Sequence, residues 1–329
     1  MHRRLAAALL GLATSIAAAD EGAFSTPFSF APAHAAASGP VRECGAVRLH
    51  GARAAGEPVH ELSALAWDAD EDRLYALSDR GYIVHLRPRF RGGRLHSVEH
   101  LATYPLLDSR GQPLPRDLRD AEGLVARRAR NGRRGDTELV VAFEIAPRLM
   151  AYTPQGRPRG GQALPRELED SHSYRGSNRQ LEGLTDSADH GFVVVPERPL
   201  LDAPAGQVTL YAQDGVRWEF RPFDPPHAAM VALETMPGGD LLALERRLVN
   251  LFHPIVFVIY RVSPGAGSGA VPARELARFD NSAGWAVDNF EGLARYVDSR
   301  YLMVSDDNGS ALQATILVCL DIDEARSAP

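Results

Sequence analysis

The sequence predicts an all-β fold, namely a β-propeller of five four-stranded blades, with six blades as the alternative count. Three observations predict it. Short apolar runs typical of strands occur in groups of four, the groups repeat about every sixty residues, and long amphipathic helical patterns are absent. Gly and Pro separate the runs, which argues against βαβ units. A β-sandwich, the competing all-β fold, does not require four-strand units that repeat in register.

The first strand of each predicted unit carries a glutamate followed by small and apolar residues. The segments are ELSALAWD (61–68), AEGLVAR (121–127), LEGLTDS (181–187), FEGLARY (290–296) and a weaker copy, ALETMPG (232–238). Their glutamates are Glu61, Glu122, Glu182, Glu291 and Glu234. Because the first strand of each propeller blade lines the central channel, the pattern predicts carboxylates that point toward one axis.

A second apolar strand follows in each unit and ends in charged residues. The five segments are RLYALSDRG (73–81), ELVVAFEI (138–145), GFVVVPERP (191–199), LLALERR (241–247) and YLMVSDDN (301–308). Asp79 and Asp306 follow equivalent serines, so we expect them at corresponding places in their blades. The acids of the segment 289–308, Glu291 with Asp306 and Asp307, are therefore expected at the mouth of the channel.

Third strands such as QVTLYAQ (207–213) and more polar fourth strands such as GVRWEFRPF (215–223) complete the units. The last unit has only three strands, and VRECGAVRLHG (41–51) is the candidate for its fourth. This pairing would close the ring and place Cys44 beside Cys319, the two cysteines of the chain. We predict a disulfide between them. The alternative is two unrelated buried thiols.

The first nineteen residues have the parts of a secretory signal peptide: basic residues, a short apolar stretch and three alanines before Asp20. The alternatives are an uncleaved anchor or a disordered tail. We expect a linker over 20–40, a single propeller domain over 41–329, and a periplasmic or secreted protein. No later apolar run is long enough to suggest a transmembrane segment.

Composition excludes several function classes. The chain is 45% hydrophobic and 24% charged, which is typical of a globular protein, and its net charge of −6 gives no reason to expect nucleic acid as a partner. Lysine is absent from the sequence, which excludes a phosphate-loop lysine, a Schiff-base lysine and a Ser–Lys pair. The motifs G-x-S-x-G, H-E-x-x-H and G-x-G-x-x-G are also absent. We expect a monomer.

Converging carboxylates repel one another unless positive charge lies among them. Arginines at strand ends could supply it, in a purely structural ladder of glutamate and arginine; the candidates are Arg80, Arg179, Arg198 and Arg246. A hard divalent cation, Ca²⁺, could also supply it, because this ion prefers carboxylate and carbonyl oxygens. The sequence leaves both interpretations open.

The densest polar segment is DSHSYRGSNRQLEG (170–183), directly before a predicted channel strand. Loops at strand ends are common places for function. Arg175 and Arg179 could hold a phosphate or carboxylate, and His172 could act as a general acid or base. The alternative is a solvated loop.

Over about residues 55–322 the sequence resembles the phytase-like family, whose description is "esterase-like activity of phytase". The resemblance rests on an ordered set of segments: ELSALAWD, DAEGL, NRQLEGL, LLALERR, DNFEGLA and LMVSDDNGSALQATIL. The resemblance implies an exported bacterial propeller hydrolase that acts on a small-molecule phosphoester or ester. By similarity to β-propeller phytases, Ca²⁺ would bind the acidic channel. Its ligands or water activators would be Glu61, Asp79, Glu122, Glu182, Glu291, Asp306 and Asp307. Phosphate would be bound by Arg80, Arg179 and Arg246.

We assign candidate catalytic roles to Glu182 and Asp306 of the acidic channel and to His172 of the loop before the predicted strand 181–187. The competing hypothesis is a non-catalytic periplasmic propeller that binds a ligand or partner and whose channel carboxylates are structural. A propeller hydrolase acting on a sugar or lactone is a third hypothesis, and it would also use a central Ca²⁺.

Overall fold

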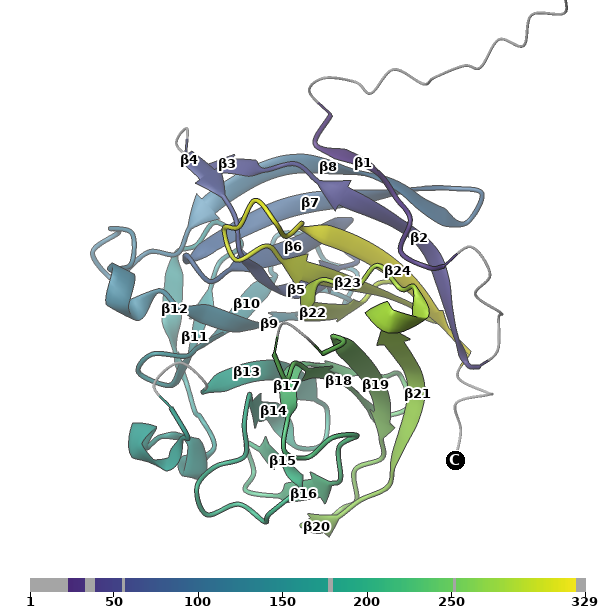
Figure 1. The fold of residues 1–329 in the computed structure, drawn as a ribbon. Coiled ribbons are helices and arrows are strands. Elements are labelled where there is room, and N and C mark those ends of the chain that lie inside the picture. The colour runs from purple at the N-terminus through teal and green to yellow at the C-terminus, as the bar shows by residue number, and fades with distance from the viewer. Residues whose placement is uncertain (1–22, 33–38, 55–56, 177–179, 251–252, 324–329) are drawn as a thin grey trace, which may run out of the picture.

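The computed structural model describes residues 23–32, 39–54, 57–176, 180–250 and 253–323. The five innermost strands surround a central axis, and a sheet runs outward from each of them (Figure 1). These innermost strands are β5 (Leu62–Asp68), β9 (Ala121–Arg127), β13 (Leu181–Ser187), β17 (Ala228–Thr235) and β22 (Asn289–Arg295). The fold is therefore a five-bladed β-propeller, as the repeat predicted.

Four blades are built from consecutive antiparallel strands, except that one short strand from the stretch of the fourth blade joins the third blade in parallel. The first continues from β5 with β6 (Arg73–Ser78), β7 (Tyr82–Arg91) and β8 (Arg94–Pro105). The second continues from β9 with β10 (Glu138–Phe143), β11 (Arg148–Tyr152) and β12 (Pro158–Gln162). The third continues from β13 with β14 (Gly191–Pro196), β15 (Val208–Ala212), β16 (Arg217–Phe220) and the short parallel strand β20 (Gly269–Ala270). The fourth continues from β17 with β18 (Leu241–Arg247), β19 (Val256–Val262) and β21 (Ala273–Asp280).

The fifth blade joins the two ends of the chain. Its order is β22, β23 (Arg300–Asp306), β24 (Ile316–Ile322), β2 (Val41–Leu49) and β1 (Ser25–Phe28). The predicted closure of the ring by the N-terminal strand is confirmed, because β2 pairs antiparallel with β24. The predicted disulfide is also confirmed: it links Cys44 on β2 to Cys319 on β24.

The N-terminal segment differs in part from the sequence-based expectation. The predicted signal peptide lies outside the described residues. Within the expected linker over 20–40, residues 25–28 form β1, which pairs with β2 as the outermost strand of the fifth blade. This short strand was missed because STPF lacks the length and the alternation that mark a strand in a sequence. A separate hairpin of β3 (Ala52–Ala54) and β4 (Glu57–Val59) precedes the first blade.

Each innermost strand contains a β-bulge near its start. The bulged residues, which the pairing with the second strand skips, are Ser63, Glu122, Glu182, Val231 and Glu291. A bulge bends the strand and redirects the side chain of the extra residue. Here the redirected side chains include three glutamates, which are thereby placed around the axis.

A small residue follows every bulge because neighbouring strands approach closely there. These residues are Ala64, Gly123, Gly183, Ala232 and Gly292. A Cβ atom at Gly123 would lie 2.7 Å from the Cβ of Leu184 in the next blade. One at Gly292 would lie 3.1 Å from the Cα of Ala64. Small residues therefore set how tightly the ring closes.

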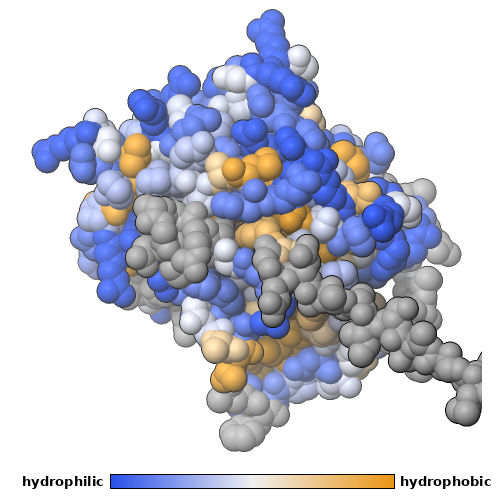
Figure 2. Space-filling model, turned by 90° about the horizontal axis from the view of Figure 1, so that it is seen from above, coloured by the Kyte–Doolittle hydropathy of each residue, from blue (hydrophilic) through white to orange (hydrophobic). Residues whose placement is uncertain are grey.

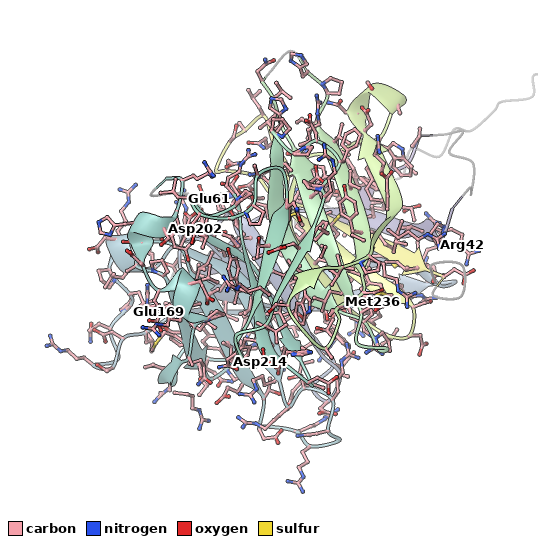
Figure 3. All side chains as sticks on the ribbon, turned by 90° about the horizontal axis from the view of Figure 1, so that it is seen from below. Arg42, Glu61, Glu169, Asp202, Asp214 and Met236 are labelled. Atoms are coloured by element: carbon pink, nitrogen blue, oxygen red, sulfur yellow. A yellow bond between two sulfur atoms is a disulfide. The ribbon has the colours of Figure 1, made fainter. Side chains whose placement is uncertain are left out.

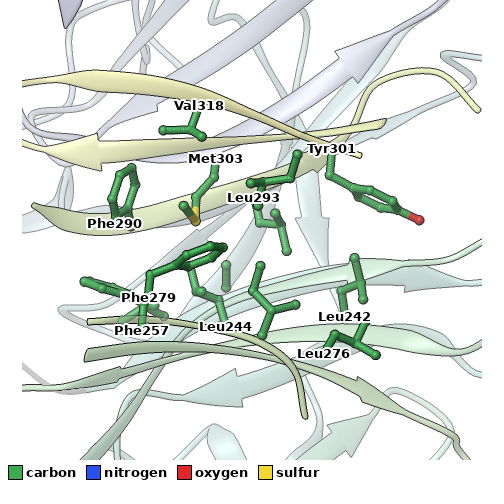
Figure 4. Close-up of a cluster of buried hydrophobic side chains, with 14 of the residues drawn as sticks. Leu242, Leu244, Phe257, Leu276, Phe279, Phe290, Leu293, Tyr301, Met303 and Val318 are labelled. Carbon is green, nitrogen blue, oxygen red and sulfur yellow. The ribbon is translucent and has the colours of Figure 1, made fainter. Parts of the chain in front are cut away.

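Apolar side chains pack between neighbouring blades. Figure 4 shows one such layer, in which Leu244, Phe257 and Phe279 of the fourth blade face Phe290 and Met303 of the fifth. The side chains fill the spaces between the ribbons (Figure 3). The outer surface seen from above is mostly hydrophilic, with small hydrophobic patches (Figure 2). Burial between blades is the main stabilising term of such a fold.

Helical structure in the described residues consists of single 3₁₀ turns. They are η1 (Arg116–Leu118), η2 (Arg166–Leu168), η3 (Ser171–Ser173) and η4 (Asn281–Ala283). Across the same residues, none of the helices has the length and apolar character needed to cross a membrane.

Candidate functional site

The bulges gather three glutamates at the narrowest part of the channel. Glu122, Glu182 and Glu291 line a cavity of about 10 Å³ together with the small residues that follow them. A cavity of this size has room for about one water molecule. Glu182 is only 8% exposed, and no hydrogen bond from another described residue reaches its carboxyl group. We call this level of the channel the waist.

The predicted equivalence of the five glutamates is wrong in two blades. The positions that correspond to Glu122 are occupied by Ser63 in the first blade and Val231 in the fourth. Glu61 lies two residues earlier, and Glu234 lies near the opposite end of its strand. The shared sequence motif gave the wrong register for these two glutamates. The register depends on the small residue where neighbouring strands come closest, which is Ala64 in the first blade and Ala232 in the fourth.

A second level of charged residues lies on one side of the waist, toward the N-terminal ends of the innermost strands. We call this side the upper side of the channel. In each second strand, one residue pairs with the residue just before the bulge. The residues that follow it are Asp79, Glu144, Glu197, Arg246 and Asp306. The backbone N–H groups of Asp79, Glu144 and Glu197 donate to the carbonyls of Glu61, Asp120 and Gln180, each at 3.0 Å. This repeated hydrogen bond shows that the blades present equivalent positions here. Glu61 is thus the counterpart of Asp120.

Arg246 is the buried cation of this level. Its guanidinium donates to Glu291 at 2.7 Å, to Glu197 at 3.2 Å and to the side-chain oxygen of Asn289. It thereby joins the third, fourth and fifth blades through charge-assisted hydrogen bonds. This part of the site has the geometry expected of a structural ladder of glutamate and arginine.

A second arginine lies at the rim. Arg80 forms a bidentate pair with Glu61, with the contact to Oε1 at 2.8 Å, and its side chain is 44% exposed. Glu61 is labelled in Figure 3. Asp307 lies beside this pair and accepts hydrogen bonds from the backbone N–H of Gly309 at 3.0 Å and the hydroxyl of Thr315 at 2.9 Å. Arg80 is therefore the cation that a ligand from solvent would meet first.

Carboxylates outnumber these two guanidinium groups. We define the acidic mouth as Glu61, Asp79, Asp120, Glu122, Glu144, Glu182, Glu197, Glu291, Asp306 and Asp307, with Arg80 and Arg246 among them. Buried carboxylates without compensating positive charge are costly, so they bind protons or cations.

Several groups of the acidic mouth hold protons near neutral pH. Burial, and then the charge of Glu61, raises the pKa of Asp79 to about 9. Burial, and then Glu291, raises the pKa of Asp306 to about 8. Burial raises the pKa of Glu144 to about 7 and the pKa of Glu182 well above its ordinary value. In contrast, the hydrogen bond from Arg80 lowers the pKa of Glu61.

Three carboxyl groups have the arrangement of a possible metal site. Asp79, Asp120 and Glu122 each offer an oxygen within 4.8 Å of the other two. Oδ1 of Asp79 is buried and lacks a hydrogen-bond partner among the described residues. A hard cation such as Ca²⁺ prefers this donor set, so the residues present fit such an ion.

A comparison with protein families matches residues 57–309 to the family described as "Phytase-like: Esterase-like activity of phytase". The chain belongs to the phytase-like family. No curated protein matches it.

The solved structures to which the phytase-like chain is similar at low sequence identity include two that act on sugars or sugar lactones by their names. One is the PQQ-bound aldose sugar dehydrogenase of Streptomyces coelicolor, with 10% identity, a TM-score of 0.41, and coverage of 87% of this chain and 99% of that one. The other is a gluconolactonase of Xanthomonas campestris, with 11% identity, a TM-score of 0.44, and coverage of 90% and 97% respectively.

Two candidate residues of the loop before β13, His172 and Arg175, are not brought into the acidic mouth of the phytase-like chain. His172 lies on η3 with its side chain 93% exposed, and its imidazole contacts Asp170 at 2.9 Å. Arg175 donates to the backbone carbonyls of Pro199 and Leu200. Arg179 lies outside the described residues. The candidate roles of His172 and Arg175 thus gain no support from the geometry.

Sequence reasoning did not select three residues of the site, Asp120, Glu144 and Glu197. The charged ends of the second strands were the available signal for Glu144 and Glu197, since FEI and PER occupy the places of SDR and SDD. Asp120 could be found only by aligning the blades on their small residues.

Proposed function

We propose that this phytase-like chain is an exported hydrolase that cleaves a small phosphoester or ester at the acidic mouth with the assistance of Ca²⁺. The observation that carries the proposal is the excess of converging carboxylates over the arginines that the described residues place beside them, Arg80, Arg246 and Arg119 next to Asp120. A purely structural ladder needs no such excess. The Cys44–Cys319 disulfide supports a periplasmic or secreted location, where disulfides persist.

Asp79, Asp120 and Glu122 would hold the ion, and the remaining acids of the mouth, with Glu61, Glu182, Glu291, Asp306 and Asp307 among them, would surround it. When bound, the ion would offset the carboxylate charge and polarise the substrate oxygen. Family membership supports hydrolysis as the reaction class.

The side chains of the chain itself divide the remaining tasks. Arg80, the exposed arginine at the rim, would bind the anionic group of the substrate. Asp306 keeps its proton near neutral pH and would donate it to the leaving oxygen. Glu182 faces the waist, which has room for one water molecule, and would accept a proton from that water once positive charge in the mouth lowers its pKa.

The competing function is a non-catalytic propeller that binds a ligand or partner. The bridging of Glu197 and Glu291 by Arg246 favours it, because this arrangement is complete without an ion. The two functions differ in whether the acidic mouth binds Ca²⁺.

The deciding experiment is thermal unfolding of the protein in EDTA and then at increasing Ca²⁺, together with a screen of phosphate and aryl esters. We expect the melting temperature to rise with Ca²⁺ concentration, as mass action requires for a ligand of the native state. We expect Asp120→Asn to abolish most of this rise. Asp117→Asn, at an exposed position on η1, removes the same charge and should leave the rise intact.

Turnover that follows the same Ca²⁺ titration would support the hydrolase. A melting temperature that ignores Ca²⁺, together with no turnover, would leave the acidic mouth as a structural ladder. A Ca²⁺ response without turnover would favour the binding protein.

A further inference from the structure

A second cavity lies at the other end of the channel. It has a volume of about 330 Å³ and is lined by residues from the C-terminal ends of all five innermost strands. Representative residues are Trp67 of β5, Arg127 of β9, Asp186 of β13, Glu234 of β17 and Arg295 of β22. The waist, with its cavity of about 10 Å³, separates it from the acidic mouth. We call it the lower cavity.

The charge of the lower cavity is opposite to that of the acidic mouth. Four arginines line it, namely Arg127, Arg128, Arg130 and Arg295, against Asp186 and Glu234. Arg127 forms ion pairs with Asp186 at 3.5 Å and Glu138 at 3.8 Å, and Arg128 forms one with Glu138 at 3.4 Å. Among the described residues, Arg130 and Arg295 form no ion pair with a carboxylate, although Glu234 is close enough to act electrostatically on both and accepts a hydrogen bond from the backbone of Arg295.

Arg130 and Arg295 are held close together. The guanidinium of Arg130 donates to the backbone carbonyl of Arg295 at 2.7 Å and to that of Tyr296 at 3.1 Å. Partial desolvation of its guanidinium by the cavity walls, and then the charge of Arg295, lowers the pKa of Arg130. Two neighbouring guanidinium groups repel each other, and this repulsion falls when an anion lies between them.

Two buried donors at the lower cavity lack an acceptor within the described structure. They are Nε1 of Trp67 and Nε of Arg295, and both belong to residues that line the cavity. Trp67 is held in place by its ring contact with Tyr296, whose centroid lies 4.4 Å away. Indole and guanidinium nitrogens can only donate, so the missing group must be an acceptor. A buried donor left unsatisfied is costly, which favours a bound acceptor.

We propose that the lower cavity is a binding site for a small oxyanion, that is, a phosphate or carboxylate group, held by Arg130, Arg295 and the indole N–H of Trp67. The volume is at the small end of the range for ligand cavities, about 300 to 1,000 Å³, so the ligand is a small molecule rather than a polymer. This site is independent of the hydrolase proposed at the acidic mouth, because the waist is too narrow to connect the two.

The test is calorimetric titration of the full chain with inorganic phosphate and, separately, with acetate, at fixed ionic strength and in EDTA. EDTA removes any contribution from a cation at the acidic mouth. We expect saturable binding of at least one of the two probes, and the stronger one identifies the class of oxyanion. Arg295→Gln and Arg130→Gln should each weaken it by about tenfold or more, as the loss of a charge-assisted hydrogen bond implies.

Arg110→Gln is the matched control, since Arg110 lies on an exposed turn and does not line the cavity. Arg130 is itself exposed, so its variant tests the proposal even if Arg295→Gln fails to fold. Trp67→Phe should weaken binding while keeping the ring beside Tyr296. No saturable binding of either probe would overturn the proposal. Equal weakening by Arg110→Gln would also overturn it, because the attraction would then be non-specific.

Discussion

At the residue scale, Arg246 has the largest structural role in the acidic mouth. Its guanidinium is the positive group that contacts both Glu197 and Glu291, and all three side chains are largely buried. Arg80 and Glu61 form an equally direct pair, but the arginine is 44% exposed. Buried and exposed ion pairs differ greatly in what their loss costs, so the two arginines should respond differently to the same substitution.

We predict that Arg246→Met destabilises the protein by about 3 kcal/mol at pH 7, because two buried carboxylates lose their cation. Arg80→Met should cost less than about 1 kcal/mol, as is typical of an exposed pair. Urea unfolding of both variants checks this. The penalty for Arg246→Met should shrink at pH 5, where the freed carboxyls can bind protons. Equal penalties for the two variants would contradict the assignment of Arg246 as the central cation.

The raised pKa values of the acidic mouth predict how stability depends on pH. Asp79, with a pKa of about 9, and Asp306, with a pKa of about 8, keep protons in the folded state that the unfolded chain has released above about pH 4. Raising the pH therefore favours the unfolded chain. We predict that, in EDTA, the melting temperature falls between about pH 5 and pH 9.

The measurement is a series of melting curves at constant ionic strength. Asp79→Asn should flatten the fall, because its side chain carries no proton to lose. Added Ca²⁺ should also oppose the fall at high pH, if the ion binds the ionised carboxylates. A melting temperature that rises through this pH range would show that the acids are ionised and compensated in the folded state.

At the scale of the element, the innermost strand combines two devices, a bulge that turns a side chain toward the axis and a small residue that lets the next blade approach. We predict that Gly292→Ala destabilises the protein by about 2 kcal/mol, as overpacking does. The added Cβ would lie 2.7 Å from Cγ1 of Val304 and 3.1 Å from backbone atoms of Ala64.

Gly161→Ala on β12 is the matched control, since a Cβ there meets only the sulfur of Met150 at 3.8 Å. Its effect on the urea midpoint should be small. A Gly292→Ala variant as stable as the wild type would mean that the ring can widen without cost. The waist would then not be fixed by strand packing.

The same element shows what the sequence could and could not predict. The strands, their order and the blade count follow from local apolar runs, and the closure by 41–51 follows from the missing fourth strand. The register of the charged residues was harder, because a bulge is invisible in a pattern of alternating residues. Glu61 and Glu122 share a motif, yet Ser63 is the true counterpart of Glu122. The lower cavity depends on strand ends from all five blades, so no local segment could indicate it.

At the scale of the whole molecule, the ring is closed twice between the same strands. Hydrogen bonds join β2 to β24, and the disulfide joins Cys44 to Cys319 across 275 residues of sequence. A cross-link over so long a stretch restricts the unfolded chain strongly, and about 5 kcal/mol is the upper end of what chain entropy provides. Because the strand pairing remains without the disulfide, the fold itself should survive its removal.

We predict that the variant Cys44→Ala with Cys319→Ala folds with the same circular dichroism spectrum as the wild type but is less stable by about 2 to 4 kcal/mol. Urea unfolding of this variant, beside the wild type with and without reductant, measures the difference. Reduced wild type should resemble the variant, which separates the effect of the bond from that of the lost sulfur atoms. If neither differs from the oxidised protein, the pairing of β2 with β24 alone holds the ring closed. If the variant fails to fold at all, the strand pairing is too weak to close a five-bladed ring by itself.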